Sequence, residues 1–546
     1  MAEAVPPIEF KQGVASGDVS SDSAVLWTRT NMEAVIKLEV STDHDFKKID
    51  FKQNFRTQEI NDFTVKTIVN GLEPNQVYYY KWRHGSASSE IGTFKTAPIQ
   101  SSSMIPPNRQ PDVDFVWSGD SDPSKINGVP EFGNWRALDS ARTEAGLDFF
   151  IYLGDTIYSD FRAGGKLPDA QTLDEYRSLY KDARAVDSLH NLLKATSTYP
   201  IWDDHEVRDD WDGETVDPVF HEIGRKAFNE YMPIRESNLK IPNSECISQP
   251  QFRVSHWGKD VDLIFVDTRP CRSASVEDIC QDDVVPALPA TLRVAFGFPP
   301  QPPAGCLAAI NDPSRTILGS TQKSLFKEAL LESTAKFKFV ITSVAIQQLY
   351  VLPYDSWEGY GAERSEILNF IRANGIDNVI FLTTDLHQNR MNEVFIDRFA
   401  NPSPVAYEFM TGPIGTVTYQ NIILRALGPQ GVAAYQALLN ILGVDCRHLD
   451  VFSYGSVNVN PASGITTISL KDENGNIIRD QLTPTISCSK QFETEVTGSD
   501  IQIYSENFEK DKHPTLKLED RMLLGKQLED RIPIPIPMSK LEDIQA

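Results

Sequence analysis

The stretch LDFFIYLGD, residues 147–155, is a short apolar run that ends in Gly-Asp. Its centre is aromatic and aliphatic, which is typical of a strand that is buried on both faces. Asp155 follows the apolar run directly, at the carboxyl end of the expected strand. In open α/β sheets the functional site lies at the carboxyl ends of the strands. The stretch therefore predicts a buried strand that carries an acidic side chain into a site.

Five further short apolar runs lie along the chain, with helical patterns between them, and five of the six runs end in Asp-containing polar clusters. Alternation of buried strands and helices predicts a layered α/β domain, which we place at residues 111–500. The six apolar runs are 113–120, 147–155, 199–206, 261–269, 337–344 and 378–387, and helices are expected at 135–144, 173–193, 322–333 and 363–374. Residues 457–470 and 475–482 are expected to add strands or hairpins.

The first hundred residues have a different pattern. Residues 8–100 contain short stretches such as AVIKLEVST, with alternating polar and apolar side chains and a turn at 71–75. This pattern predicts a separate N-terminal β-sandwich domain of immunoglobulin or fibronectin type. Residues 101–110 are expected to be a linker, and residues 501–546 a C-terminal tail.

The composition excludes some classes of protein. Of 546 residues, 40% are hydrophobic and 10% aromatic, enough for a packed core and too many for global disorder. The 52 Lys and Arg face 76 Asp and Glu, a net charge of −24, which argues against a nucleic-acid-binding module. The stretch 201–220 holds eight acids and one Arg. It is either a solvated acidic loop or a cation site.

The cysteines and the chain's start bear on its compartment. No apolar run reaches 18 residues, so no transmembrane helix is expected. The start MAEAVPPIEF lacks the features of a signal peptide, so the chain is either intracellular or a mature form without its leader. The cysteine number is even, and Cys271, Cys280 and Cys306 lie in or beside a Pro-rich insertion, residues 273–313. We therefore expect disulfides, with the pairing open, and an extracellular, periplasmic or cell-surface location.

Polar clusters at the ends of four expected strands are the candidate metal ligands. Carboxylates suit hard cations, imidazole suits transition metals, and a tyrosine phenolate favours a trivalent ion such as Fe³⁺. Asp385 and His387 are two residues apart on a strand or its extension, so we expect them to face the same side. The candidates are Asp120, Asp155, Tyr158, the WDDHE stretch with Asp203, Asp204, His205 and Glu206, and Asp385 with His387.

Each candidate also has an ordinary structural explanation. Asp155 could be a turn residue, His205 a surface ion pair and Tyr158 a core aromatic. Four such clusters in one α/β domain instead indicate a metal site. Two ions held there could bind a phosphoryl group, generate hydroxide from bound water and stabilise the leaving oxygen, and His205 could donate a proton to it.

The motifs together resemble the PhoD-type alkaline phosphatases and phosphodiesterases, within the metallophosphoesterase superfamily. The resemblance runs in order from about residue 10 to about residue 460. It is carried by GVASGD at 13–18, AVLWTR at 24–29, LGDTIY at 153–158, WDDHEV at 202–207, LIFVDTR at 263–269, DSWEGYGAER at 355–364 and TTDLHQNRM at 383–391.

This resemblance implies an N-terminal β-sandwich followed by a four-layer α/β/β/α metallophosphoesterase domain, and phosphoester hydrolysis at a cluster of iron with calcium. It implies that Asp155 bridges the metals, that Tyr158 binds the ferric ion and that Asp385 and His387 are ligands. Asp204 and His205 fall where the superfamily has an Asn-His pair. It also implies that the C-terminal segment packs over the site entrance.

The chain departs from the family at one position. Known members have Ser-Cys after the first strand, with the cysteine as an iron ligand, whereas this chain has Gly119 and Asp120 after Ser118. We expect Asp120 to replace the thiolate, which makes the site harder and admits Mn²⁺, Mg²⁺ or Zn²⁺ in place of iron. Asp209 and Asp210, where some relatives carry Asn, are alternative ligands.

Arg269 and the overall function each leave alternatives. Arg269 could bind the substrate phosphate, because guanidinium matches phosphate bidentately, or it could tie down Asp267 or a helix end. We assign catalytic roles to His205, Asp204 and Arg269, acting on a small phosphoester, with the oligomeric state open. The alternative function is a secreted binding or adhesion protein with a degenerate phosphatase-like domain.

Overall fold

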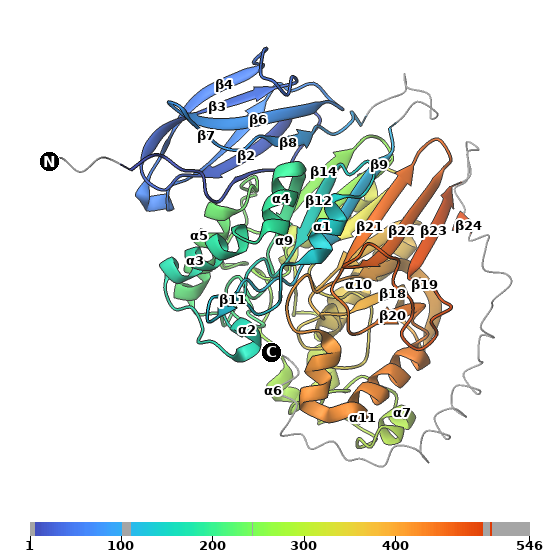
Figure 1. Ribbon diagram of the computed structural model, residues 1–546. Helices are drawn as coiled ribbons and strands as arrows, with labels where there is room; N and C mark the ends of the chain where they lie inside the picture. Colours follow the sequence, from blue (N-terminus) through green and yellow to red (C-terminus); the bar gives the residue numbers. More distant parts are fainter. Residues whose placement is uncertain (1–5, 101–110, 238, 243, 495–502, 505–546) are drawn as a thin grey trace.

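The computed structural model describes residues 6–100, 111–237, 239–242, 244–494 and 503–504 (Figure 1). The expected linker, 101–110, lies outside the described residues. So does the C-terminal tail, 501–546, apart from residues 503 and 504. The packing of the tail over the site therefore stays a prediction.

The six apolar runs are strands, and they divide between two sheets. β9 (Val113–Ser118), β12 (Phe149–Leu153) and β13 (Ser197–Ile201) are parallel neighbours in a 10-stranded sheet. β15 (Val261–Phe265), β16 (Phe337–Ile341) and β17 (Val379–Thr383) are parallel neighbours in a 7-stranded sheet. Parallel strands bring their carboxyl ends to one edge, so each sheet has one edge where the polar clusters meet.

The remaining strands flank these two parallel groups. The first sheet has the order β24-β23-β22-β21-β9-β12-β13-β1-β2-β5, and the second β14-β15-β16-β17-β19-β18-β20. The added strands are β1 (Val14–Gly17), β2 (Ser23–Arg29), β5 (Thr64–Asn70), β14 (Arg253–Trp257), β18 (Asn389–Asp397), β19 (Asn401–Met410), β20 (Cys446–His448), β21 (Ser453–Asn460), β22 (Ile465–Asp472), β23 (Ser489–Thr494) and β24 (Ile503–Tyr504).

The two sheets face each other across one apolar core. Side chains of β9, β12 and β13 meet those of β15, β16 and β17 there, for example Phe115 against Phe339 at 5.2 Å between ring centroids. Helices cover the outer faces of the two sheets. The first sheet is covered by α1 (Arg136–Arg142), α3 (Leu173–Arg184), α4 (Asp187–Ala195) and α5 (Pro218–Tyr231). The second sheet is covered by α9 (Gly319–Glu332) and α10 (Gly361–Ala373). α11 (Tyr419–Leu442) packs in a separate cluster with residues 284–298 (Figure 1).

Two expected elements differ from the structure. The helix expected at 173–193 is two helices, because Val186 takes an extended backbone and α4 restarts at Asp187, where an acidic side chain suits a helix N-terminus. Residues 475–482 form no strand: they make only isolated bridges, such as Lys471 with Ile477.

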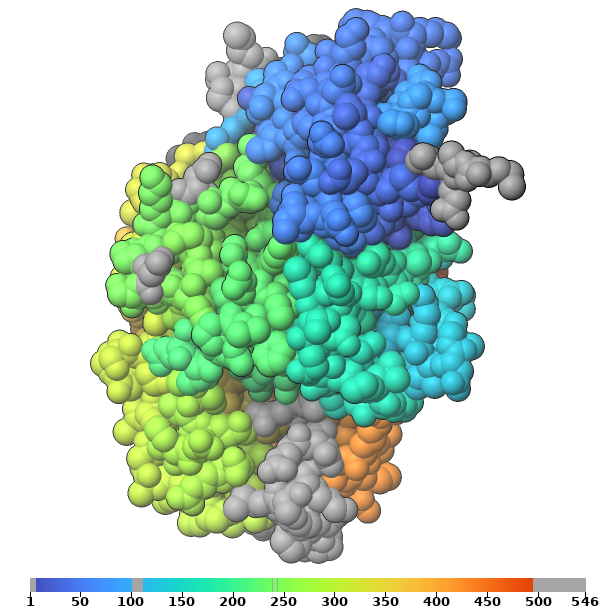
Figure 2. Space-filling model, turned by 90° about the vertical axis from the view of Figure 1, so that its left-hand side faces the viewer, coloured from blue at the N-terminus to red at the C-terminus, as the bar shows by residue number. Residues whose placement is uncertain are grey.

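The N-terminal region is joined to the α/β sheets by strand pairing. β3 (Ala34–Ser41), β4 (Phe51–Thr57), β6 (Val77–His84), β7 (Ala87–Ser88) and β8 (Gly92–Lys95) form a sheet of their own. β1, however, pairs in parallel with β13, so β1, β2 and β5 extend the 10-stranded sheet. Figure 2 shows the N-terminal region seated directly on the following segments. The expected separation at residue 100 is therefore not a boundary between sheets.

Three disulfides use all six cysteines. Two of them, Cys246–Cys271 and Cys280–Cys306, lie at and within the expected insertion. The third, Cys446–Cys488, joins β20 to the segment before β23. The expectation of disulfides is confirmed, and no cysteine is left as a free thiol.

A substitution at Trp27 tests whether the N-terminal region and the α/β sheets unfold together. Trp27 lies on β2, is fully buried in the main core and donates from Nε1 to the carbonyl of Glu230 at 2.8 Å. Trp27→Ala should lower the free energy of unfolding by about 3–5 kcal/mol, in one transition that includes both regions. Chemical denaturation followed by tryptophan fluorescence and circular dichroism measures this.

Ile60→Ala is the control, because Ile60 is 66% exposed and its loss should change stability by no more than about 0.5 kcal/mol. Two separate transitions in Trp27→Ala, with only one of them shifted, would show that the N-terminal region folds independently.

Candidate metal centre

The backbone turns sharply where the ligand-bearing strands end. Asp120, Asp155, Asp385 and His387 have positive φ angles of 60°, 48°, 72° and 46°. Non-glycine residues rarely adopt this left-handed conformation, and it clusters at functional sites because the surroundings must impose it. The turn at each strand end brings the following side chain towards the common site.

Glycines allow the segments to approach closely. A Cβ on Gly119 would lie 2.1 Å from the carbonyl oxygen of Leu153, and a Cβ on Gly412 would lie 2.2 Å from Oδ2 of Asp120. Both contacts are far shorter than packed atoms allow, so any larger residue would push these segments apart. The site is compact because these two positions carry no side chain.

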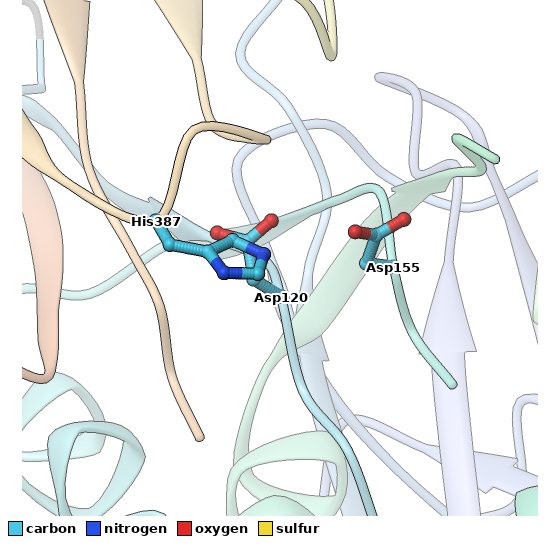
Figure 3. A group of neighbouring side chains, drawn as sticks. All are labelled: Asp120, Asp155 and His387. Carbon is cyan, nitrogen blue, oxygen red and sulfur yellow. The ribbon is translucent and has the colours of Figure 1, made fainter. Parts of the chain in front are cut away.

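The first group of candidate ligands joins the two sheets. Asp120, Asp155 and His387 are buried and have ligand atoms within 4.8 Å of one another (Figure 3). The Tyr158 hydroxyl lies 2.8 Å from Nε2 of His387 and 3.1 Å from Oδ2 of Asp155. Nδ1 of His387 lies 2.7 Å from the carbonyl oxygen of Val417, to which it donates, and this leaves Nε2 free to bind a metal.

The second group shares Asp155 with the first. Its members are Asp155, Asp204 and His205, again within 4.8 Å. The His205 ring packs against the Tyr158 ring at 4.1 Å between centroids, tilted by 30°, and its Nδ1 lies 2.7 Å from Oδ1 of Asp160. Because Asp155 belongs to both groups, its position suits the predicted bridge between two ions.

A third and a fourth group extend the cluster towards the surface. Asp203, Asp204 and Asp385 form one, and Asp204 with Asp209 and Asp210 forms the other. The alternative candidates Asp209 and Asp210 therefore lie beside Asp204. The Asp210 amide donates to Oδ2 of Asp204 at 2.8 Å, and the Asp209 amide donates to Oδ2 of Asp160 at 2.6 Å.

The prediction that Asp385 and His387 follow the alternation of a strand, and so face the same side, is wrong. β17 ends at Thr383, and both residues lie in the turn that follows, with left-handed backbones. They no longer alternate as strand residues do, and each falls in a different group: Asp385 beside Asp204, and His387 beside Asp155.

Three buried carboxylate oxygens in the cluster have no hydrogen-bond partner among the residues that the structure describes: Oδ2 of Asp120, Oδ1 of Asp155 and Oδ2 of Asp203. Burial raises the pKa of Asp120 and Asp155, and the charges of Asp203 and Asp204 raise the two values further. An unpaired buried charge is costly, and a metal cation is the group that uses such oxygens as ligands. The residues present therefore fit a metal centre.

The two histidines have opposite electrostatic surroundings. Burial lowers the pKa of His387 to about 4, so its imidazole is neutral, as a metal ligand must be. Burial would also lower the pKa of His205, but Asp204, Asp155 and Asp160 outweigh it and raise the pKa well above its usual value. Burial opposes ionisation of Asp204, yet His205 and Arg269 hold its pKa below the ordinary range. His205 is thus a proton donor beside an ionised Asp204.

Arg269 donates from its guanidinium to two carboxylates. It is fully buried, and it donates to Oδ1 of Asp203 at 2.6 Å and to both oxygens of Asp355 at 2.6 and 2.8 Å. Its backbone amide contacts Oδ1 of Asp267 at 3.4 Å. The geometry favours a residue that orients Asp203 over one that contacts phosphate, and a direct catalytic role for Arg269 stays a prediction.

Sequence reasoning gave too little weight to three neighbours of the ligands. Asp203 contributes to a ligand group, Asp160 orients His205, and Asp355 pairs with Arg269. Asp203 lies within the WDDHE stretch and Asp160 lies two residues after LGDTIY, so the closeness of both to proposed ligands in the sequence was a usable signal. The pairing of Asp355 with Arg269 joins segments 86 residues apart, and no local pattern reveals it.

Comparison with known proteins bears on this centre directly. A model of the PhoD-like phosphatase family matches residues 124–462, and a model of the N-terminal domain of PhoD-like phosphatases matches residues 2–98. The chain belongs to the PhoD-like phosphatase family. The matched regions include every strand end that supplies the centre except the end of β9, which carries Asp120.

Two relatives illustrate the family. Alkaline phosphatase D of Bacillus subtilis (strain 168) is 28% identical over 433 residues, covering 71% of this chain and 66% of the relative, so just under two thirds of that protein is matched. A solved structure described as "Structure of PhoD" covers 97% of this chain and 99% of its own, with 22% identity and a TM-score of 0.69. That similarity shows a shared fold.

No helix within the described ranges is long and apolar enough to cross a membrane.

Metal removal should make the stability of the protein depend on pH. Carboxyls such as Asp120 and Asp155, with a pKa raised by burial, hold protons in the folded metal-free protein that the unfolded chain has released. The free energy of unfolding should therefore fall as pH rises above about 4, the ordinary value for aspartate. Bound cations remove this dependence, because the carboxylates are then neutralised.

Thermal unfolding of chelator-treated and metal-loaded protein at about pH 5 and about pH 8 measures this, and the difference in Tm should be larger at the higher pH. Equal differences at both values would contradict the buried, unpaired state of these carboxyls.

Proposed function

We propose that this protein hydrolyses small phosphoesters with the help of two or more bound metal ions, as an alkaline phosphatase or phosphodiesterase. The observation that carries the proposal is the set of three buried carboxylate oxygens on Asp120, Asp155 and Asp203, which accept no hydrogen bond from any described residue and belong to overlapping ligand groups. Membership of the PhoD-like phosphatase family supports it.

The ligand groups suggest how two ions would be held. Asp120, Tyr158 and His387 would hold one, and Asp204 with Asp385 the other, with Asp155 between them. Asp203 is a further candidate for the second position. Ions held by these residues would polarise the phosphoryl group and would lower the pKa of a bound water, which would supply the nucleophile at neutral pH.

His205 would protonate the leaving group. Asp160 fixes its ring through Nδ1, and the surrounding carboxylates keep the imidazole protonated by raising its pKa. A protonated, oriented imidazole beside the reacting phosphate is suited to general acid catalysis, which contributes about 10²–10⁴-fold to a rate. Asp204 would serve this step by keeping the positive charge on His205.

The donor atoms support a proposal for the metals. All six cysteines form disulfides, so no thiolate supplements the centre. Oxygen donors dominate, with a single imidazole and a phenol in the first group. We propose calcium with a ferric ion at the Tyr158 position, with Mn²⁺, Mg²⁺ or Zn²⁺ as alternatives that this oxygen-rich site also admits.

The finer architecture and the location are part of the same proposal. The two facing sheets with helices on their outer faces suit the four-layer metallophosphoesterase sandwich, and the N-terminal strands suit an immunoglobulin or fibronectin-like sandwich. Three disulfides favour an extracellular, periplasmic or cell-surface protein. The adhesion alternative is less well supported, because a degenerate site would not keep its ligands together.

Asp155→Asn tests the proposed activity. Loss of an outer partner of a metal site typically lowers activity about 10–100-fold. Because Asp155 would be a direct ligand, hydrolysis of p-nitrophenyl phosphate and bis-p-nitrophenyl phosphate by the metal-loaded protein should fall by more than this. Asp174→Asn, at a carboxylate that is 92% exposed, should keep the full rate. Full activity in Asp155→Asn would show that the site is wrongly assigned, and no hydrolysis by the wild type with any metal would refute the proposed function.

A further inference from the structure

Glu206 lies beside the metal centre without belonging to any of its ligand groups. It is fully buried and follows His205 directly. Its Oε1 accepts hydrogen bonds from the backbone amide and the hydroxyl of Thr156, both at 2.6 Å. Its Oε2 accepts from the backbone amide of Asp203 at 2.9 Å. Both oxygens are thus occupied by protein donors.

These two partners belong to different ligand-bearing segments. Thr156 follows Asp155 at the end of β12, and Asp203 precedes Asp204 at the end of β13. One carboxylate therefore holds the backbones next to both Asp155 and Asp204. Those two aspartates have ligand atoms within 4.8 Å of each other.

The strand pairing does not fix this spacing by itself. The last ladder bond between the two strands runs from the Gly154 amide to the Ile201 carbonyl at 3.0 Å. The next backbone bond between these segments, among the described residues, is from the Ser159 amide to the His205 carbonyl at 3.0 Å. Glu206 bridges the interval between them, which is where Asp155 and Asp204 project.

The backbone of Glu206 is itself held from behind. A Cβ on Gly224 of α5 would lie 2.2 Å from the Glu206 carbonyl oxygen, so the helix packs directly against this residue. The Val207 amide also donates to the Asp204 carbonyl at 2.7 Å, which closes the turn. Glu206 therefore reaches both segments from a fixed position.

We propose that Glu206 is a positioning residue that sets the spacing between Asp155 and Asp204 and thereby the affinity of the centre for divalent cations. Hydrogen bonds to a carboxylate are shorter and stronger than those to a neutral acceptor. Outer partners of metal ligands commonly determine affinity in this way. The inference rests on the proposed metal centre, but concerns binding rather than turnover.

Glu206→Gln tests this role in the full chain. The glutamine amide keeps one acceptor oxygen and places an NH₂ group against a backbone amide or the Thr156 hydroxyl, so one segment loses its anchor. After treatment with chelator, titration with Mn²⁺ by calorimetry should show affinity weakened by about 10–100-fold. Unchanged affinity would overturn the proposal.

Glu363→Gln is a matched control. Glu363 is also buried, and it accepts from the Thr316 hydroxyl and the Ile317 amide, both at 2.5 Å, but it belongs to none of the ligand groups. The Glu363→Gln variant should have a lower Tm and an unchanged Mn²⁺ affinity. If Glu206→Gln likewise lowers Tm and leaves Mn²⁺ affinity unchanged, Glu206 has only a structural role.

A second pair of variants decides the matter if Glu206→Gln does not fold. Thr156→Val removes only the hydroxyl bond to Glu206, and Thr156→Ser retains it. Mn²⁺ affinity should fall in the first variant and recover in the second, and equal affinities would overturn the proposal. A wild-type protein that binds no Mn²⁺ and no other divalent cation would instead refute the metal centre itself.

Discussion

Buried carboxylate oxygens that accept no hydrogen bond from the described residues are the constraint on which the site depends. Within the described part of the chain, Asp120, Asp155 and Asp203 each have one such oxygen. The Arg269 guanidinium donates to the other oxygen of Asp203 and to Asp355. Such an arrangement is unfavourable for ionised carboxylates in a metal-free protein, and a bound cation would relieve it.

The surrounding structure holds this unfavourable arrangement in place. Left-handed backbones at the strand ends turn the aspartates inward, and Gly119 and Gly412 allow the segments to lie against one another. The parallel pairing of β1 with β13 then connects the N-terminal region to the strand that precedes Asp203. The N-terminal region therefore helps to position the strand that leads into the centre.

Much of this was predictable, because it depends on local patterns. An apolar run such as residues 147–155 must be buried, and the Asp that follows it must lie at a sheet edge, so the strands and most candidate ligands could be found from the sequence. The sequence favoured Asp204 and did not reveal that Asp203 also joins a ligand group, since the turn after β13 decides where each side chain points. Nor could it assign Arg269 to Asp355 or join β1 to β13, because these contacts link distant segments.

The central claim is that cations complete the fold at these strand ends. Elemental analysis of the purified, undenatured protein tests it most directly, as the molar ratio of each metal to protein after exhaustive dialysis. The account predicts at least two tightly held metal ions per chain, because Asp155 belongs to two separate ligand groups. Protein that is folded and contains no metal, and that takes up none when calcium, iron, manganese, magnesium and zinc are supplied, would contradict it.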